Sequence, residues 1–293
     1  MGHIAGELKS LTLNDGRSLW VRHWHDEREG ALVFLHGLLD SSAGWTRVCE
    51  HLCGTRVAID LAGFGYSDPP TEGSIAGYAR DVAEALEEIG LRRCTIVGHS
   101  LGGAVAAALT ELCPDRVAGL VLLAPAGFGR IQLAEAVSVP GLRNVVQAAL
   151  PFALMSRAAV TAGYMTMVSN GRPPEGDVVE RITSRGRWLV HGAREGTRAV
   201  VDAGRSSHAF HRRRLAYSGP VFAVWGEQDR LVPPAHRSGV QRALPQAEIE
   251  VWPGMGHHPV CERFDELLSL LVRAAAAGDA LAGDGAGRHV AAA

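Results

Sequence analysis

Short, largely apolar runs recur along the chain and constrain its fold more than any other feature of the sequence. Such a run is typical of a strand that is buried on both faces of a parallel sheet. Helical periodicity lies between the runs; in residues 74–89, for example, Tyr78 and Val82 would share one helix face. The runs are residues 31–36, 56–60, 94–99, 119–124, 221–225 and 248–252. Their alternation with helices predicts a mostly parallel sheet that is covered by helices on both sides.

Two further strands are expected near the N-terminus, at residues 7–13 and 18–24, on either side of Asn14-Asp15-Gly16. An Asp-Gly pair between two β-forming runs is a strong signal for a hairpin turn. With this hairpin, the sequence predicts an α/β fold with a mostly parallel, eight-stranded sheet.

One long stretch, residues 128–216, interrupts the alternation because it contains no convincing buried strand. We expect it to form a helical cap, broken at prolines such as Pro151, over a core made of residues 1–127 and 217–277. Further core helices are expected at residues 101–112, 234–244 and 263–277. The Ala- and Gly-rich residues 278–293 are expected to be a disordered tail.

The run that ends at His99 continues as Gly98-His99-Ser100-Leu101-Gly102 and then becomes Ala-rich and helical. A strand, a tight turn and a helix in this order are the context of a nucleophile elbow, in which a serine side chain stands clear of a strained backbone. Gly98 and Gly102 have no Cβ, so the strand and the helix can close around Ser100.

A serine nucleophile needs a base to accept its proton and an acid to orient that base. Two candidate acids, Glu227 and Asp229, follow the run at 221–225. Two candidate bases, His257 and His258, follow the run at 248–252 in a Gly-rich loop. The order Ser, acid, His along the chain is the order that this kind of fold requires.

Five stretches together resemble the α/β-hydrolase superfamily, in the branch with a helical cap. They are residues 35–45, 60–68, 98–103, 226–233 and 254–258. The resemblance implies Ser100 as the nucleophile, His257 as the base and Asp229 as the acid that orients it. It also implies an oxyanion hole formed by the backbone N–H groups of Leu38 and Leu101.

Several side chains are expected to line the substrate pocket near this triad. They are His36, His99, Phe128, Leu154, Met155, Val232 and His258. For His36 and His99 a purely structural role is the competing interpretation.

A serine nucleophile favours acyl chemistry, whereas relatives that attack alkyl carbon use an aspartate at this position. The sequence therefore predicts hydrolysis of a carboxylic ester with an apolar acyl or aryl group, through an acyl-serine intermediate. The alternatives are a C–C hydrolase of the meta-cleavage type, a cofactor-free perhydrolase or acyltransferase, and a ligand-binding receptor on a hydrolase scaffold.

Composition excludes other classes of function. The net charge is −2, which argues against nucleic acid as a partner. No apolar run is long enough for a membrane span and no signal peptide is visible, so a cytoplasmic protein is expected. It is expected to be a monomer or a homodimer. Neither a cluster of metal ligands nor a dinucleotide fingerprint is present in the sequence, so no metal and no cofactor are expected.

Overall fold

A computed structural model of the chain describes residues 6–26, 30–132, 139–169, 178–183, 209–210 and 212–288. Its centre is a sheet of eight strands in the order β1-β2-β4-β3-β5-β6-β7-β8. The strands are β1 (Glu7–Thr12), β2 (Ser18–Trp24), β3 (Ala31–Leu35), β4 (Thr55–Ile59), β5 (Cys94–His99), β6 (Val117–Leu123), β7 (Val221–Gly226) and β8 (Glu248–Trp252). β1 and β2 pair antiparallel with each other, β2 pairs antiparallel with β4, and all later pairs are parallel. The predicted eight-stranded, mostly parallel sheet is confirmed.

The hairpin between β1 and β2 forms at the predicted turn. Gly16 has a φ of +84°, a conformation that a residue with a Cβ rarely adopts. The N–H of Leu13 donates to the carbonyl oxygen of Arg17 at 2.8 Å and closes the turn. The turn residues Asn14-Asp15-Gly16 therefore predict the antiparallel pairing of β1 with β2 at this edge of the sheet.

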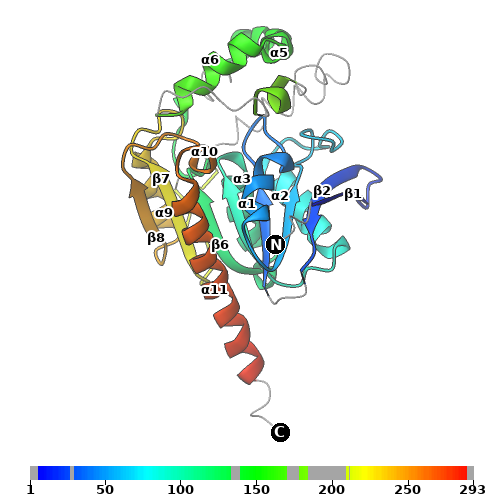
Figure 1. Cartoon of the computed structure of the whole chain (residues 1–293), viewed down its shortest axis with the longest axis vertical. Coiled ribbons are helices and arrows are strands. Elements are labelled where there is room, and N and C mark those ends of the chain that lie inside the picture. The colour runs from blue at the N-terminus through cyan, green and yellow to red at the C-terminus, as the bar shows by residue number, and fades with distance from the viewer. Residues whose placement is uncertain are drawn as a thin grey trace.

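Helices cover both faces of the sheet (Figure 1). They are η1 (Ser42–Trp45), α1 (Thr46–Glu50), α2 (Ile75–Glu88), α3 (Leu101–Leu112), η2 (Pro114–Arg116), η3 (Pro234–His236), α9 (Arg237–Ala243), α10 (Pro259–Glu262) and α11 (Phe264–Arg288). Side chains of α2, α3 and α9 join one hydrophobic core, and those of α1 and α11 join a second. The two cores lie on opposite faces, because neighbouring residues of β5, Ile96 and Val97, belong to different cores.

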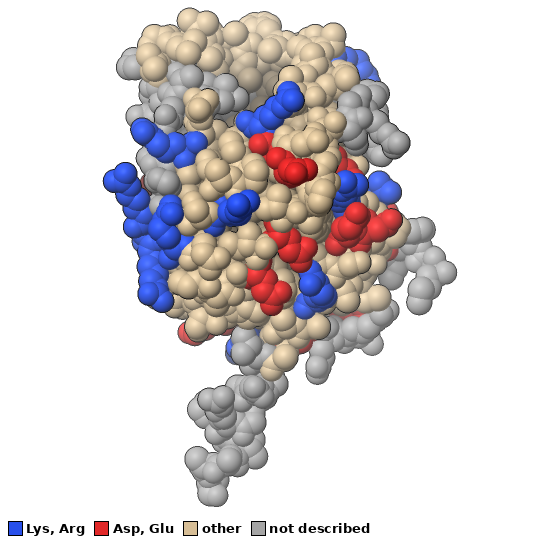
Figure 2. Space-filling view, turned by 90° about the vertical axis from the view of Figure 1, so that its left-hand side faces the viewer, with Lys and Arg blue, Asp and Glu red and all other residues tan. Residues whose placement is uncertain are grey.

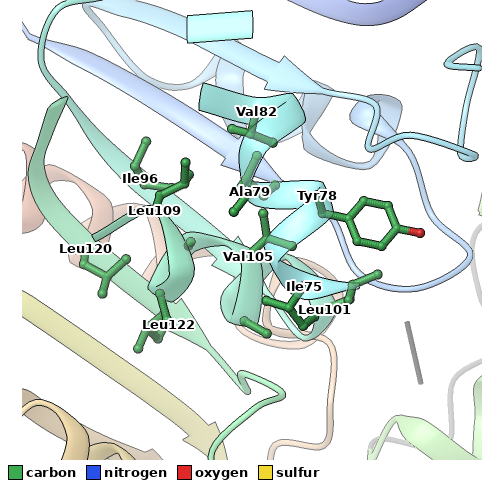
Figure 3. Packing of buried hydrophobic residues seen from close by; sticks show 14 of the residues in the cluster. Ile75, Tyr78, Ala79, Val82, Ile96, Leu101, Val105, Leu109, Leu120 and Leu122 are labelled. Carbon is green, nitrogen blue, oxygen red and sulfur yellow. The ribbon is translucent and has the colours of Figure 1, made fainter. Parts of the chain in front are cut away.

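Figure 3 shows how the first of these cores is packed. Val105 of α3 lies between α2, which carries Tyr78 and Val82, and β6, which carries Leu120 and Leu122, and the Tyr78 ring points away from the other four side chains. These five side chains are fully buried. Burial of each large apolar side chain stabilises the fold by roughly 1.5–3 kcal/mol before chain entropy is counted. The packing holds α3 against the sheet, and so fixes the position of Ser100, the residue directly before this helix.

The ends of the predicted cap, residues 128–216, pack in the first core, which includes Phe128, Ile131, Phe210 and Leu215. The rest of this segment, called the cap below, is described only in part. It contains α5 (Pro140–Met155), α6 (Arg157–Met167) and a helical segment at residues 178–183, above the sheet at the top of Figure 1. The predicted break at Pro151 is wrong, because α5 continues through this residue, whose ring is buried. No single helix among the described residues is long and apolar enough to cross a membrane, although Asn144–Met155 and Arg157–Met167 pass that test as a pair bent by 103°.

The described helices α5 and α6 of the cap differ in their outer surface from the core. In the view of Figure 2, acidic and basic side chains lie mostly below a top that is largely uncharged. Exposed large apolar side chains are found on α5 and α6, namely Leu142, Val145, Phe152, Met155 and Met165. The two helices therefore present apolar residues to solvent as well as to the interior.

The C-terminal helix is longer than predicted. We expected a helix that ends at residue 277 and a disordered tail over residues 278–293, but α11 continues to Arg288. Helix propensity does not predict this continuation, because residues 278–288 contain four glycines. Packing supports its start: Gly278 is buried, and a Cβ there would lie 2.6 Å from Oγ1 of Thr95 in β5. Residues 289–293 lie outside the described part of the chain.

Candidate active site

Ser100 lies at the junction of β5 and α3, in a backbone conformation that residues other than glycine rarely adopt. Its φ is +51° and its ψ is −113°. A Cβ on Gly98 would lie 2.3 Å from the carbonyl oxygen of Gly102, and a Cβ on Gly102 would lie 2.2 Å from that of Leu35. Only glycine fits at these two positions, so the sequence Gly-x-Ser-x-Gly allows the sharp turn that the strand and the helix make.

Hydrogen bonds to the neighbouring strand hold Ser100 in this conformation. Its N–H donates to the carbonyl oxygen of Leu123 at 2.9 Å, and its own carbonyl oxygen accepts from the N–H of Ala126 at 2.9 Å. Such a strained residue persists only when its surroundings fix it, and strained residues cluster at functional sites.

His257 and Asp229 form a buried pair. His257 Nδ1 lies 2.7 Å from Asp229 Oδ2, and the two side chains are 2% and 0% exposed. The other carboxylate oxygen of Asp229 accepts from the N–H groups of Leu231 and Val232, both at 2.9 Å. Because a carboxylate only accepts hydrogen bonds, Nδ1 of His257 carries the proton and Nε2 is left as an acceptor. A neutral imidazole in this tautomer can take a proton from a hydroxyl group.

The rival candidates have other partners. The Glu227 carboxylate accepts from the N–H of Gly254 at 3.1 Å, and its residue is exposed. The His258 ring stacks on Tyr164 of the cap, with 5.2 Å between centroids and 20° between planes. Burial, with His99 and His257 nearby, lowers the pKa of His258 well below its usual value. Among the four candidates, His257 and Asp229 are the pair that is hydrogen-bonded.

His36 and His99 hold the loops around Ser100. His36 Nδ1 lies 2.7 Å from the carbonyl oxygen of Gly37, and its Nε2 accepts from the N–H of Leu61 at 3.0 Å. His99 Nε2 donates to the carbonyl oxygen of His257 at 2.8 Å. Burial, with a smaller contribution from His257, lowers the pKa of His99 to about 4, so this imidazole is neutral at pH 7.

The backbone groups expected to form the oxyanion hole lie on two segments next to Ser100. Leu101 is the first residue of α3, where helix N–H groups have no partner within the helix. Leu38 follows Gly37, and a Cβ on Gly37 would lie 3.3 Å from Cβ of Ser100. The turn that carries Leu38 therefore lies directly beside the serine.

A cavity of about 280 Å³ opens between these loops and the cap. Of the residues predicted for the site, those that line it are His36, Leu38, His99, Ser100, Leu154, His257 and His258. Three predicted pocket residues lie elsewhere. Phe128 is fully buried in the main core, with its ring 5.5 Å from that of Phe210. Val232 is also fully buried there, and Met155 is 39% exposed on the outer side of α5. The residue before Val232, Leu231, lines the cavity in its place.

The cavity is also lined by residues outside the predicted pocket list. Arg181, in the helical segment at 178–183 of the cap, forms an ion pair with Asp40 of the core at 3.3 Å, and both side chains line the cavity. The rest of the wall is mostly apolar: Leu39, Trp45, Val160, Tyr164, Met167, Val178, Ile182 and Val260. Asp40 lies within one of the recognised stretches, but the cap carries no motif that would have indicated Arg181 or Tyr164. Within the part of the chain that the structure describes, no group of three or more His, Cys, Asp or Glu residues is arranged to hold a metal ion.

Comparison with known proteins gives consistent matches. The family described as the alpha/beta hydrolase fold matches residues 30–264. The dihydrolipoyllysine-residue acetyltransferase component of the acetoin cleaving system of Cupriavidus necator is 30% identical over 247 residues, which cover 82% of this chain and 62% of that protein. This chain thus spans less than two thirds of that relative.

Two further matches cover most of both chains. The sn-1-specific diacylglycerol lipase of Mus musculus is 29% identical over 241 residues, which cover 78% of this chain and 75% of that protein. The crystal structure of Cfl2 from Burkholderia cenocepacia superposes with a TM-score of 0.76 at 20% identity, covering 92% of this chain and 95% of that one. The structural match shows a shared fold.

Proposed function

Because the chain belongs to the alpha/beta hydrolase family, we propose that it is a serine hydrolase that cleaves carboxylic esters through an acyl-serine intermediate. One observation carries the proposal. The strained Ser100 shares a cavity with His257, whose Nδ1 is hydrogen-bonded to a buried carboxylate at 2.7 Å. Nucleophile, base and orienting acid in this relation form the arrangement that activates a serine hydroxyl.

The reaction would proceed in two halves. Ser100 Oγ attacks the carbonyl carbon while its proton passes to Nε2 of His257, and the negative charge on the carbonyl oxygen is met by the N–H groups of Leu38 and Leu101. The ester C–O bond then breaks, and His257 returns the proton to the departing alcohol. A water molecule repeats the sequence on the acyl-serine and releases the carboxylic acid. Loss of one oxyanion donor typically lowers the rate by roughly 10²–10³.

The shape and lining of the cavity support an apolar substrate. Its volume of about 280 Å³ suits a small molecule, and most of its wall is aliphatic or aromatic. The diacylglycerol lipase among the relatives is named for an ester substrate, which is consistent with an ester. We therefore propose an ester with an apolar acyl or aryl group.

Hydrolysis of p-nitrophenyl esters tests this proposal. We expect release of p-nitrophenol by the wild type and its loss in Ser100→Ala, since no other group would form the acyl-enzyme. A fluorophosphonate should add once to the wild type by intact mass and not to Ser100→Ala. The matched control is Ser238→Ala, which removes an exposed hydroxyl on α9 and should leave both readouts unchanged.

Two results would contradict the proposal. Equal inactivity and no adduct in wild type and Ser100→Ala, across panels of esters, lactones and vinylogous diketones, would favour a ligand-binding receptor. Cleavage of diketones without cleavage of esters would favour the C–C hydrolase.

A further inference from the structure

Glu262, the last residue of α10, accepts hydrogen bonds from two segments that are far apart in the sequence. Its Oε2 accepts from the N–H of Gly256 at 2.9 Å, and its Oε1 accepts from the N–H of His258 at 3.1 Å. Oε2 also accepts from Ser169 of the cap, from the N–H at 2.9 Å and from Oγ at 2.7 Å. A carboxylate can accept about four hydrogen bonds on its two oxygens, and these four donors account for all of them.

The same cap segment lies directly on the loop that carries His257. The N–H of His257 donates to the carbonyl oxygen of Met167, at the end of α6, at 2.8 Å. A Cβ on Gly256 would lie 2.4 Å from that oxygen. Ser169 Oγ also lies against the carbonyl oxygen of Gly254. Figure 1 shows α6 descending from the top of the molecule toward α10, where these contacts form. Residues 167–169 and 254–258 are therefore joined along their backbones.

A side-chain contact reinforces the junction. Tyr164, one turn before the end of α6, stacks on His258, the residue after the candidate base. Both N–H groups that flank His257, those of Gly256 and His258, end on the Glu262 carboxylate. The backbone on each side of the base is thus fixed by one side chain, and this side chain is also bonded to the cap.

We propose that Glu262 is a positioning residue, which holds the loop of His257 and the cap segment 167–169 in one unit so that the orientation of the base depends on the seating of the cap. The proposal rests on the proposed function only for its kinetic consequence. The substitution Glu262→Gln tests it with nearly constant shape. An amide has one acceptor oxygen, and its NH₂ group would face N–H donors, so at least one set of these hydrogen bonds is lost.

The junction that Glu262 makes between residues 167–169 and 254–258 is tested by hydrogen–deuterium exchange on the full chain, which needs no substrate. In Glu262→Gln we expect exchange to accelerate by about tenfold to a hundredfold in peptides that cover 254–258 and 167–169. Peptides from α3 should exchange as in the wild type. The matched control is Glu248→Gln, an exposed carboxylate at the start of β8, which should change neither region.

The kinetic consequence is tested with a short-chain p-nitrophenyl ester. A base displaced by a fraction of an ångström should lower kcat of Glu262→Gln by about tenfold to a hundredfold. The KM should stay within about twofold. Titration with the fluorophosphonate gives the fraction of active protein, so kcat per active site separates a displaced base from a merely less stable protein. Ser169→Ala removes one donor on the cap side and should lower kcat in the same direction by a smaller factor.

The outcomes separate this proposal from the proposed function. Wild-type exchange rates in Glu262→Gln would show that Glu262 does not hold the two segments together. Accelerated exchange with wild-type kcat would show that Glu262 does not position the base. If the wild type cleaves no ester and takes no fluorophosphonate, the proposed function fails. The exchange data then decide on their own whether Glu262 joins the two segments.

Discussion

At the scale of single residues, the hydrogen bond between Asp229 and His257 gives a sharp prediction. In Asp229→Asn, the amide NH₂ would face Nδ1 and favour the tautomer with the proton on Nε2, which cannot accept the serine proton. We expect kcat for ester hydrolysis to fall by about 10⁴-fold with little change in the unfolding midpoint. Steady-state kinetics and urea denaturation of the same preparations measure both quantities.

Glu227→Gln is the control, because the sequence leaves Glu227 and Asp229 as alternatives. The Glu227 side chain bonds the N–H of Gly254 and has no bond to His257 among the described contacts. Its loss should therefore lower kcat by less than about tenfold. A larger loss in Glu227→Gln than in Asp229→Asn would assign the orienting role to Glu227.

At the scale of elements, the turn between β5 and α3 depends on two glycines that are in contact with backbone. In Gly98→Ala the new Cβ would lie 2.3 Å from the carbonyl oxygen of Gly102, and backbone cannot turn aside as a side chain can. We expect the free energy of unfolding to fall by about 3 kcal/mol, the upper part of the usual range for overpacking. Urea denaturation followed by circular dichroism measures the change.

Gly163→Ala provides the matched comparison in the cap. No atom lies within 4 Å of the Cβ position of Gly163, in the interior of α6. Alanine there should raise the free energy of unfolding by about 0.5–1 kcal/mol through its higher helix propensity. An equal effect of the two substitutions would mean that the contact at the elbow does not matter.

The sequence predicted the elements of the core far better than those of the cap. β5, α3 and β8 have the expected boundaries, because strand-forming runs and glycines are local signals. In the cap, α5 passes through Pro151, which is buried. Helix propensity alone cannot anticipate such burial, which depends on residues distant in sequence.

At the scale of the whole molecule, histidines buried between core and cap make stability depend on pH. The pKa of His99 is lowered from 6.5 to about 4, chiefly by burial. Between pH 6.5 and pH 4 this histidine is protonated in the unfolded chain and neutral in the folded chain. Its contribution to the free energy of unfolding is therefore complete above pH 6.5 and is lost as the pH falls toward 4. This group alone removes about 3 kcal/mol over that window. His258, whose pKa is also lowered, adds to the loss.

Urea denaturation at pH 7.0 and pH 4.5 measures this dependence. The difference in free energy of unfolding between the two pH values should be smaller in His99→Asn than in the wild type. His25→Asn, which replaces an exposed histidine, should keep the wild-type difference. An unchanged difference in His99→Asn would show that this imidazole is not kept neutral by folding.

The sequence by itself determined the sheet, the sharp turn at Ser100 and the order in which serine, acid and histidine occur, because each is written in a few adjacent residues. The tertiary structure decided which candidates meet. His257 bonds Asp229 across 28 residues, His99 bonds the backbone of His257 across 158, and Glu262 bonds Ser169 across 93. In the structure, Phe128 and Val232 are buried in the core and do not line the cavity as predicted. Burial and hydrogen bonding at such separations depend on how the helices pack, which local patterns do not specify.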